Sequence, residues 1–241
     1  MSSRKAARSP ARRRWWRWVL GVVLILALVP VIQVTLVRFI DPPVTPLMVL
    51  RSAEARWEKR PVPARQYLWR PIERIPPDFL KFVFIAEDQR FFQHHGFDWR
   101  EVGLARQQAE RTGKKPRGAS TISMQCARSL FLWQGRSWVR KGLEAYYTFW
   151  VETLLSKRRI LELYANVIEM GDGIYGIDAA ARAHFGVDAG RLTREQSAAL
   201  AAILPNPRKL NPRVPSPKLT ARCAKILRQE KQVAFPTNLL H

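Results

Sequence analysis

Residues 78–98, DFLKFVFIAEDQRFFQHHGFD, decide the fold and open as a helix. Asp78 is the expected N-cap, and Gly96 is the expected helix stop. Apolar side chains recur at helical spacing and predict one broad buried face, made by Phe79, Phe82, Val83 and Ala86. Glu87 lies at the edge of that face, where partial desolvation is expected to raise its pKa toward neutral pH. The alternative is a solvated Glu-Asp pair on a surface helix.

Composition narrows the class of protein. The chain has 241 residues, a net charge of +22 and 47% hydrophobic residues, which excludes a disordered chain. Such a charge indicates an anionic partner, namely nucleic acid, an anionic membrane or a phosphorylated substrate. The two cysteines, Cys126 and Cys223, match no metal-binding spacing and are expected to be free, mostly buried thiols.

The N-terminus has the pattern of a membrane anchor. Seven basic residues fall within the first 17 positions, and an apolar run long enough to cross a bilayer follows from Val19 to Val37. A cleaved signal peptide is the alternative, but its apolar core would be shorter. We therefore predict an uncleaved anchor, with the basic flank in the cytoplasm and the chain after about Arg38 outside. Without those seven charges the remainder still carries +15.

The rest of the chain alternates proline-rich and helical segments. Eight prolines between residues 41 and 77 disfavour long regular elements, which predicts a tether with room for one short helix near residues 47–59. Helical patterns then recur from about residue 120 to residue 204, and two clusters of charged residues accompany them, one before the first of these helices and one within the next.

The first charged cluster precedes a helix. Arg117 lies in a basic loop, and Ser120 or Thr121 can cap the helix that follows. Free N–H groups at a helix start, with an arginine beside them, form an anion site. A plain capped helix is the alternative reading, but capping alone requires no basic cluster.

The second charged cluster lies within a helix predicted from residue 136 to about residue 155. Arg140 and Lys141 fall on the same face as Glu144. An ordinary intrahelical ion pair would contribute only a few tenths of a kcal/mol. Because the helix is otherwise mostly apolar, we expect the charged trio to line a cleft.

Taken in order, five stretches resemble one enzyme family. Residues 87–96 match E-D-x-x-F-x-x-H-x-G, residues 117–125 match R-G-x-S-T-I-x-x-Q, and residues 140–144 match R-K-x-x-E. Residues 157–166 match K-x-x-I-L-E-x-Y-x-N, and residues 195–207 match the last motif. The chain thus resembles the monofunctional biosynthetic peptidoglycan glycosyltransferases, whose module also occurs in bifunctional penicillin-binding proteins. Met124, Ser129 and His184 depart from the family pattern and put substrate fit in question.

The resemblance, which covers roughly residues 72–212, implies a mainly α fold. A lysozyme-like helical glycosyltransferase domain with a smaller membrane-facing lobe would follow one transmembrane helix. The expected organisation is a basic cytoplasmic tail at 1–14, a transmembrane anchor at 15–40, a Pro-rich juxtamembrane linker at 41–71 and the glycosyltransferase domain at 72–241.

The resemblance also implies the reaction. Such enzymes polymerise lipid II into linear glycan strands, with inversion at the anomeric carbon and release of polyprenyl pyrophosphate. Glu87 would be the catalytic base, and Glu144 would orient the donor site through a divalent metal or Lys141. No cofactor is required by the sequence, and a Mg or Mn ion at Glu144 is left open. The substrate-binding set implied is Arg117, Ser120, Thr121, Gln125, Arg128, Arg136 and Lys141, of which Arg117, Arg128, Arg136 and Lys141 would hold pyrophosphate.

The expected partners are lipid II, the growing glycan strand, membrane lipids and other cell-wall synthesis and division proteins, but no nucleic acid. The enzyme would be single-pass in the bacterial inner membrane, with a periplasmic catalytic domain. An apolar segment is expected to dip into the bilayer interface or, alternatively, to pack in the core: Leu130, Phe131, Leu132, Trp133 and Trp138.

Two other functions fit parts of the pattern. A muramidase-like hydrolase would also use two carboxylates, but it would not need the basic cluster or the anchor. A membrane-tethered nucleic-acid binder would explain the charge, but export outside the membrane argues against it.

Overall fold

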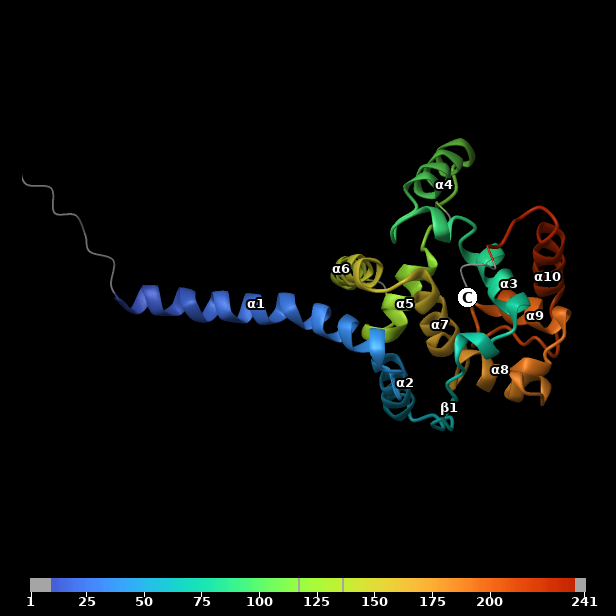
Figure 1. Cartoon of the computed structure of the whole chain (residues 1–241), viewed down its shortest axis with the longest axis horizontal. Helices are drawn as coiled ribbons and strands as arrows, with labels where there is room; N and C mark the ends of the chain where they lie inside the picture. Colours follow the sequence, from blue (N-terminus) through green and yellow to red (C-terminus); the bar gives the residue numbers. More distant parts are fainter. Residues whose placement is uncertain (1–9, 117, 136, 237–241) are drawn as a thin grey trace, which may run out of the picture.

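The computed structural model describes residues 10–116, 118–135 and 137–236, with side chains described from residue 15 onward. The fold is mainly helical, as predicted (Figure 1). The α-helices are α1 (Pro10–Phe39), α2 (Pro46–Trp57), α3 (Pro77–Glu87), α4 (Trp99–Thr112), α5 (Ile122–Phe131), α6 (Trp138–Leu154), α7 (Lys157–Val167), α8 (Gly176–Phe185), α9 (Arg194–Ile203) and α10 (Pro217–Gln229). Short elements join them: 3-10 turns η1 (Ile72–Arg74), η2 (Phe91–Gln93) and η3 (Ala189–Arg191), and strands β1 (Gln66–Tyr67), β2 (Glu169–Gly171) and β3 (Ile174–Tyr175).

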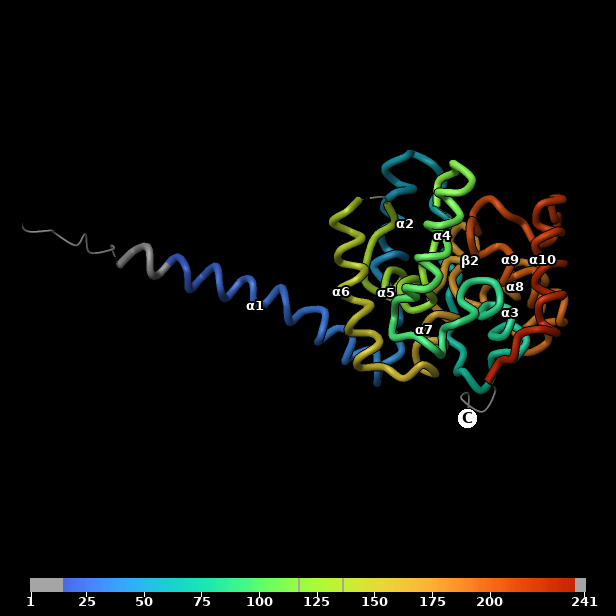
Figure 2. Tube along the Cα trace, turned by 90° about the horizontal axis from the view of Figure 1, so that it is seen from above, coloured from blue at the N-terminus to red at the C-terminus, as the bar shows by residue number. Residues whose placement is uncertain are grey.

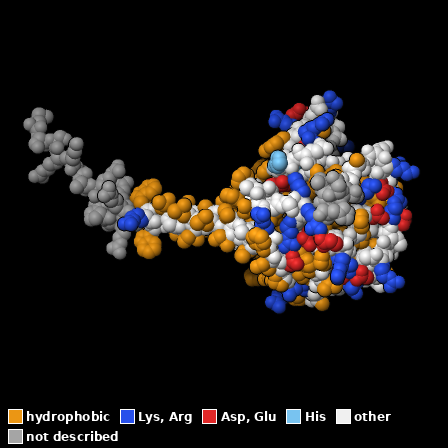
Figure 3. Space-filling model, viewed as in Figure 1, with side chains coloured by type: hydrophobic (Ala, Val, Ile, Leu, Met, Phe, Trp, Pro, Cys, Tyr) orange, Lys and Arg blue, Asp and Glu red, His pale blue; other side chains and the backbone are white. Residues whose placement is uncertain are grey.

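Helix α1 projects far from the remainder of the chain (Figure 1). Its segment Trp15–Phe39 is long and apolar enough to cross a membrane, by length and composition. Apolar side chains cover the visible face of this projecting helix (Figure 3). Only its last turns enter the domain, where Val34 is fully buried and Val37 is 9% exposed within the main core.

The domain core joins two groups of helices. Helix α3 packs against α9 and α10, while α5 packs against α6 and α7. Both perpendicular views place α6 at the edge of the domain nearest the projecting helix α1, and α10 at the opposite edge (Figures 1 and 2). The apolar face predicted for residues 78–98 is confirmed, because Phe79, Phe82 and Val83 are fully buried.

The segment expected as a tether, residues 41–71, packs onto the domain. β1 pairs in parallel with β3, and β2 pairs antiparallel to β3, which gives the strand order β1-β3-β2. Leu47 and Met48 of α2 form a second small core with Tyr175 of β3. The prolines keep the regular elements short, as expected, but they do not prevent the segment from burying apolar side chains.

The boundaries of α3 differ from the predicted ones. The N-cap is Pro76 rather than Asp78, because the helix begins at Pro77, whose fixed φ suits the first helical position and which has no N–H to satisfy. The helix ends at Glu87, so Gly96 is not its stop. Gly96 instead lies in the loop before α4 with φ +89°, where an added Cβ would approach Thr148 Cγ2 to 2.8 Å.

The expectation that the segment 130–138 touches a bilayer is wrong for two of its apolar residues, Leu130 and Leu132. Leu130 and Leu132 are each 3% exposed and belong to the main core, and Phe131 packs against that core. Trp133 is 39% exposed and Trp138 is 90% exposed. The apolar surface on this side therefore belongs mainly to α6.

Candidate active site

A cleft of about 960 Å³ opens where α3, α5 and α10 meet. The end of α3, the loop after it, the start of α4, residues 118–121 and the segment after α9 also line it. Five of the predicted site residues line this cleft, namely Glu87, Ser120, Thr121, Gln125 and Arg128. The structure thus brings together residues from two separate motifs.

Glu87 lies at the C-terminal end of α3 with its side chain 12% exposed. Gln125 Nε2 donates to one carboxylate oxygen at 2.9 Å, and Arg222 Nη2 donates to the other at 2.9 Å. Burial raises the pKa of Glu87 above its ordinary value, against the opposing effects of the Gln125 hydrogen bond and the charges of Arg222 and Arg128. A raised pKa makes this carboxylate a stronger base than a solvent-exposed glutamate, and the direction of the shift is the one expected from the sequence.

A residue of α7, Tyr164, holds the Gln125 side chain in place. The Tyr164 hydroxyl donates to Gln125 Oε1 at 3.1 Å, which turns the amide NH₂ toward Glu87. Burial raises the pKa of Tyr164 well above its ordinary value, so its hydroxyl stays protonated and remains a donor. This chain of contacts fixes the orientation of the carboxylate.

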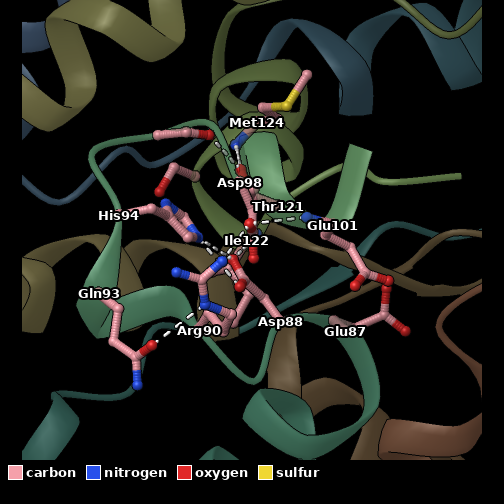
Figure 4. A network of polar contacts seen from close by, with 12 residues as sticks. Glu87, Asp88, Arg90, Gln93, His94, Asp98, Glu101, Thr121, Ile122 and Met124 are labelled. Carbon is pink, nitrogen blue, oxygen red and sulfur yellow. Dashed lines mark hydrogen bonds and ion pairs between the residues drawn. The ribbon is translucent and has the colours of Figure 1, made fainter. Parts of the chain in front are cut away.

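Asp88 ties the loop after α3 to the start of α5 (Figure 4). Its carboxylate accepts from His94 Nε2 at 3.0 Å and from the Ile122 backbone N–H at 3.1 Å. Thr121 caps α5 by accepting from Met124 N–H at 3.2 Å and donates its hydroxyl to Gly96 O at 2.6 Å. The expected cap is therefore Thr121, while the Ser120 carbonyl accepts a long 3.4 Å bond from Gln125.

The charged trio on α6 forms ion pairs, but none of its three members is among the residues that line this cleft, contrary to the expectation from the sequence. Glu144 is fully buried, and its two oxygens accept from Arg140 Nη1 and, at 2.5 Å, from Lys141 Nζ. Arg128 Nη1 lies 3.8 Å from Glu144. Because Arg128 also lines the cleft together with Glu87, it connects the trio on α6 to the cleft. Arg140 Nε donates to Gly135 O at 2.6 Å. Two predicted cations, Arg117 and Arg136, lie outside the described residues.

The surroundings of Glu144 do not fit a divalent cation. Both carboxylate oxygens already bind cationic side chains, and a Mg or Mn site needs several oxygen ligands. No cluster of three or more His, Cys, Asp or Glu side chains occurs among the residues that the structure describes. Of the two ways in which Glu144 was expected to act, contact with Lys141 is the one that the side chains form.

Sequence reasoning missed Arg222. It stands on α10, 135 residues from its partner Glu87 and outside all five motifs. The cysteines are as expected, since both are free, with Cys126 buried and Cys223 partly buried. His184, which departs from the family pattern, contacts the Met170 carbonyl through Nε2 at 3.0 Å and so has a structural partner.

Comparison with known proteins gives one consistent result. A family model described as Transglycosylase matches residues 56–231. A biosynthetic peptidoglycan transglycosylase of Xanthomonas campestris pv. campestris (strain B100) is 50% identical over 233 residues, which cover 96% of this chain and 94% of that protein. A protein of the same name from Xylella fastidiosa (strain 9a5c) is 49% identical over 220 residues, covering 91% and 90%. Another from Xanthomonas oryzae pv. oryzae (strain KACC10331 / KXO85) is 46% identical over 235 residues, covering 98% and 96%.

Proposed function

Because the chain belongs to the transglycosylase family of peptidoglycan biosynthesis, we propose that Glu87 is the general base of a lipid II polymerase. The enzyme is a peptidoglycan glycosyltransferase, and its substrates are lipid II and the growing glycan strand. The observation that carries the assignment is the buried Glu87 carboxylate, whose pKa is raised and which faces the cleft. An ionised carboxylate in this position can take a proton from a sugar hydroxyl.

The proposed step transfers a glycosyl group. The 4-hydroxyl oxygen of the acceptor sugar forms a bond to the anomeric carbon of the donor while Glu87 takes the hydroxyl proton. The bond from that carbon to the pyrophosphate oxygen breaks, and its electron pair leaves with the polyprenyl pyrophosphate. Attack from the face opposite the leaving group inverts the anomeric configuration.

We propose that Arg128, Lys141 and Arg136 stabilise the departing pyrophosphate. Arg128 supports this role because its Nε is buried and has no hydrogen-bond partner among the described residues. An unmet buried donor costs about 1–3 kcal/mol, and a phosphate oxygen would supply the missing acceptor. Arg117, Ser120 and Thr121 complete the proposed substrate-binding set; Ser120 and Thr121 line the cleft.

Glu144 would act on the donor site through its neighbours. It is fully buried and bonded to Arg140 and Lys141, with Arg128 at 3.8 Å. A fixed anion among three cations reduces their mutual repulsion and limits the positions that their side chains can adopt. We therefore propose Glu144 as the residue that aligns the leaving-group cations.

We also propose that α1 is a retained single-pass anchor, with the N-terminus cytoplasmic and the domain periplasmic. The basic flank and the apolar segment Trp15–Phe39 support this topology. Membrane lipids are then partners of the exposed apolar residues of α6, and contacts with other cell-wall synthesis and division proteins stay a prediction.

The test is polymerisation of lipid II by the full chain, with Glu87→Gln as the variant. We expect the rate to fall by about 10²–10⁴-fold, because the side chain keeps its size and loses only its proton affinity. Glycan product and released polyprenyl pyrophosphate are measured together, and circular dichroism confirms the fold. Glu110→Gln, on the exposed surface of α4, is the matched control and should leave the rate unchanged.

Two results would overturn the proposal. A wild-type rate in the Glu87→Gln variant would exclude Glu87 as the base. Cleavage of existing glycan without polymer formation would instead favour a hydrolase.

A further inference from the structure

The end of α1 is part of the enzyme as well as of the anchor. Val34 and Val37 lie in the same core cluster as the side chains of α5, α6 and α7. Helix α1 runs from Pro10 to Phe39 with Pro30 inside it, and the domain contacts Ala27 before this proline as well as Val34 and Val37 after it, so α1 is held on both sides of the proline. The contacts at this junction therefore fix the orientation of the domain relative to α1 and, through the proposed anchor, relative to the membrane.

Arg159, at the start of α7, makes most of the polar contacts at this junction. Its Nε donates to Val37 O at 3.0 Å, and its Nη2 donates to Ile40 O at 3.3 Å. The final carbonyl groups of a helix have no partner within the helix, and a cation there also interacts favourably with the helix dipole. Arg159 thus supplies from another helix the C-terminal capping that α1 would otherwise take from water.

The remaining faces of the Arg159 guanidinium are also engaged. Nη2 lies 2.8 Å from Asp41, just after α1, and Nη1 lies 2.7 Å from Glu162 on the next turn of α7. The guanidinium stands over the Trp69 ring at 5.3 Å. The Arg159 side chain is 15% exposed and Glu162 is 12% exposed, so this ion pair is shielded from solvent more than a surface ion pair would be, whereas Asp41 is 50% exposed.

Helix α6 also contacts α1. The Tyr146 hydroxyl donates to Ala27 O at 2.7 Å, and the Tyr147 hydroxyl donates to Gln33 Oε1 at 2.5 Å. Gln33 is a polar residue within an apolar span, where an amide is costly unless it is hydrogen-bonded. The two tyrosines and Arg159 together hold α1 against two helices.

Both of these helices carry active-site residues. Helix α7 carries Tyr164, which orients Gln125 beside Glu87, and helix α6 carries Glu144 with its cations. A rotation of α1 at the junction would therefore change the height and tilt of the cleft relative to the bilayer. The lipid-linked phosphate groups of the substrate stay at the level of the bilayer surface, so the cleft must meet them there.

We propose that Arg159 is a positioning residue for polymerisation, which holds the cleft at the level of the membrane-borne pyrophosphate by clamping the end of α1. The inference rests on the proposed function and on the proposed anchor. Loss of this clamp should lower the polymerisation rate only for a substrate that is held in the membrane. A freely diffusing substrate can enter the cleft at any tilt of the domain.

The experiment compares two substrates with the full chain in vesicles. One is long-chain lipid II in the same vesicles, and the other is a water-soluble, short-chain lipid II analogue. Arg159→Ala should lower the rate on the vesicle-borne substrate by about tenfold or more, since a ~1 Å misplacement can cost 10²-fold. The rate on the soluble analogue should stay within about twofold of wild type, because the geometry within the cleft is unchanged.

Two further variants make the comparison specific. Arg158→Ala removes the neighbouring arginine, which pairs with the exposed Glu73, and should leave both rates unchanged. Arg159→Lys keeps the charge but offers one nitrogen in place of a planar fork, so it should recover only part of the loss. Thermal unfolding is followed for each, and Arg159→Lys replaces Arg159→Ala if the latter unfolds below the assay temperature.

The outcomes are distinct. A selective loss on the vesicle-borne substrate supports the proposal. Equal losses on both substrates, or no loss on either, would overturn it, because Arg159 would then support only the domain or have no effect. A wild-type enzyme that polymerises neither substrate would instead overturn the proposed function.

Discussion

At the residue scale, the protonation of Glu87 depends on two opposing effects. Burial raises its pKa, while the Gln125 hydrogen bond and the Arg222 charge lower it. A general base must be ionised, so activity falls as the pH drops through the pKa of Glu87. Replacing Arg222 by Gln removes one stabilising charge, and the pKa of Glu87 should rise further. We therefore expect the acidic limb of the kcat profile to move to higher pH in Arg222→Gln.

The matched control is Arg228→Gln, which removes an exposed cation from the same helix, α10. It should leave the acidic limb in place, because Arg228 is not a cleft-lining residue. An acidic limb that stays in place in Arg222→Gln, or that moves to lower pH, would contradict this account of Glu87. Arg222→Lys should restore most of the wild-type profile.

Gly96 offers a second test at this scale. Its φ of +89° and the 2.8 Å approach to Thr148 leave no room for a Cβ. Gly96→Ala should lower the free energy of unfolding by about 1–3 kcal/mol through backbone strain alone, and by more through the clash. Gly113, with φ +65° and no neighbour within 4 Å, is the control, since Gly113→Ala adds only strain. Equal melting temperatures for the two variants would show that the contact with Thr148 is unimportant.

At the element scale, α6 is the part of the domain closest to the proposed bilayer. It lies at the edge nearest α1 in both views (Figures 1 and 2), and three of its apolar side chains are exposed: Trp138 at 90%, Val139 at 72% and Phe149 at 53%. Trp rings favour the membrane–water interface. We therefore expect α6 to lie against the headgroups.

A spin label checks this placement in the full chain in vesicles. The label is introduced as Trp138→Cys or, for comparison, as Val214→Cys, which is 76% exposed before α10. Cys223 is replaced by Ala, and the buried Cys126 is retained. The label at 138 should collide more with oxygen and less with a water-soluble relaxant than the label at 214. Equal accessibility at the two positions would show that α6 faces water.

Elements were easier to predict than the contacts between them. Regular apolar spacing identified α3, α5 and α6, because a helix is specified largely by its own residues. The contact of Lys141 with Glu144 was also accessible, because the two residues share one helix face, whereas Glu87 and Gln125 were predicted as site residues but not as a contact. Arg222 was not, because nothing in local spacing reports a contact between residues 135 positions apart. Leu132 was ambiguous, since core and interfacial runs have the same apolar pattern.

At the scale of the whole molecule, the orientation in the membrane remains to be measured. We predict that protease added to spheroplasts with an intact inner membrane digests the domain, because the proposed topology places it outside that membrane. The N-terminus of the mature protein should still contain the apolar segment Trp15–Phe39. A mature N-terminus beyond Val37, or a protected domain, would contradict the proposed topology.

The burial of Val34 and Val37 also limits how this protein can be rearranged by evolution. A membrane anchor and an enzyme domain that are joined by a flexible linker can be recombined as separate modules. Here the two share residues, and each buried valine contributes about 1.5–3 kcal/mol to the domain. A gene fusion that replaced the first 40 residues with an unrelated leader would still deliver the chain to the membrane, but it would leave a gap beside α6 and α7. We therefore expect the proposed anchor and the enzyme to tolerate exchange only as one unit.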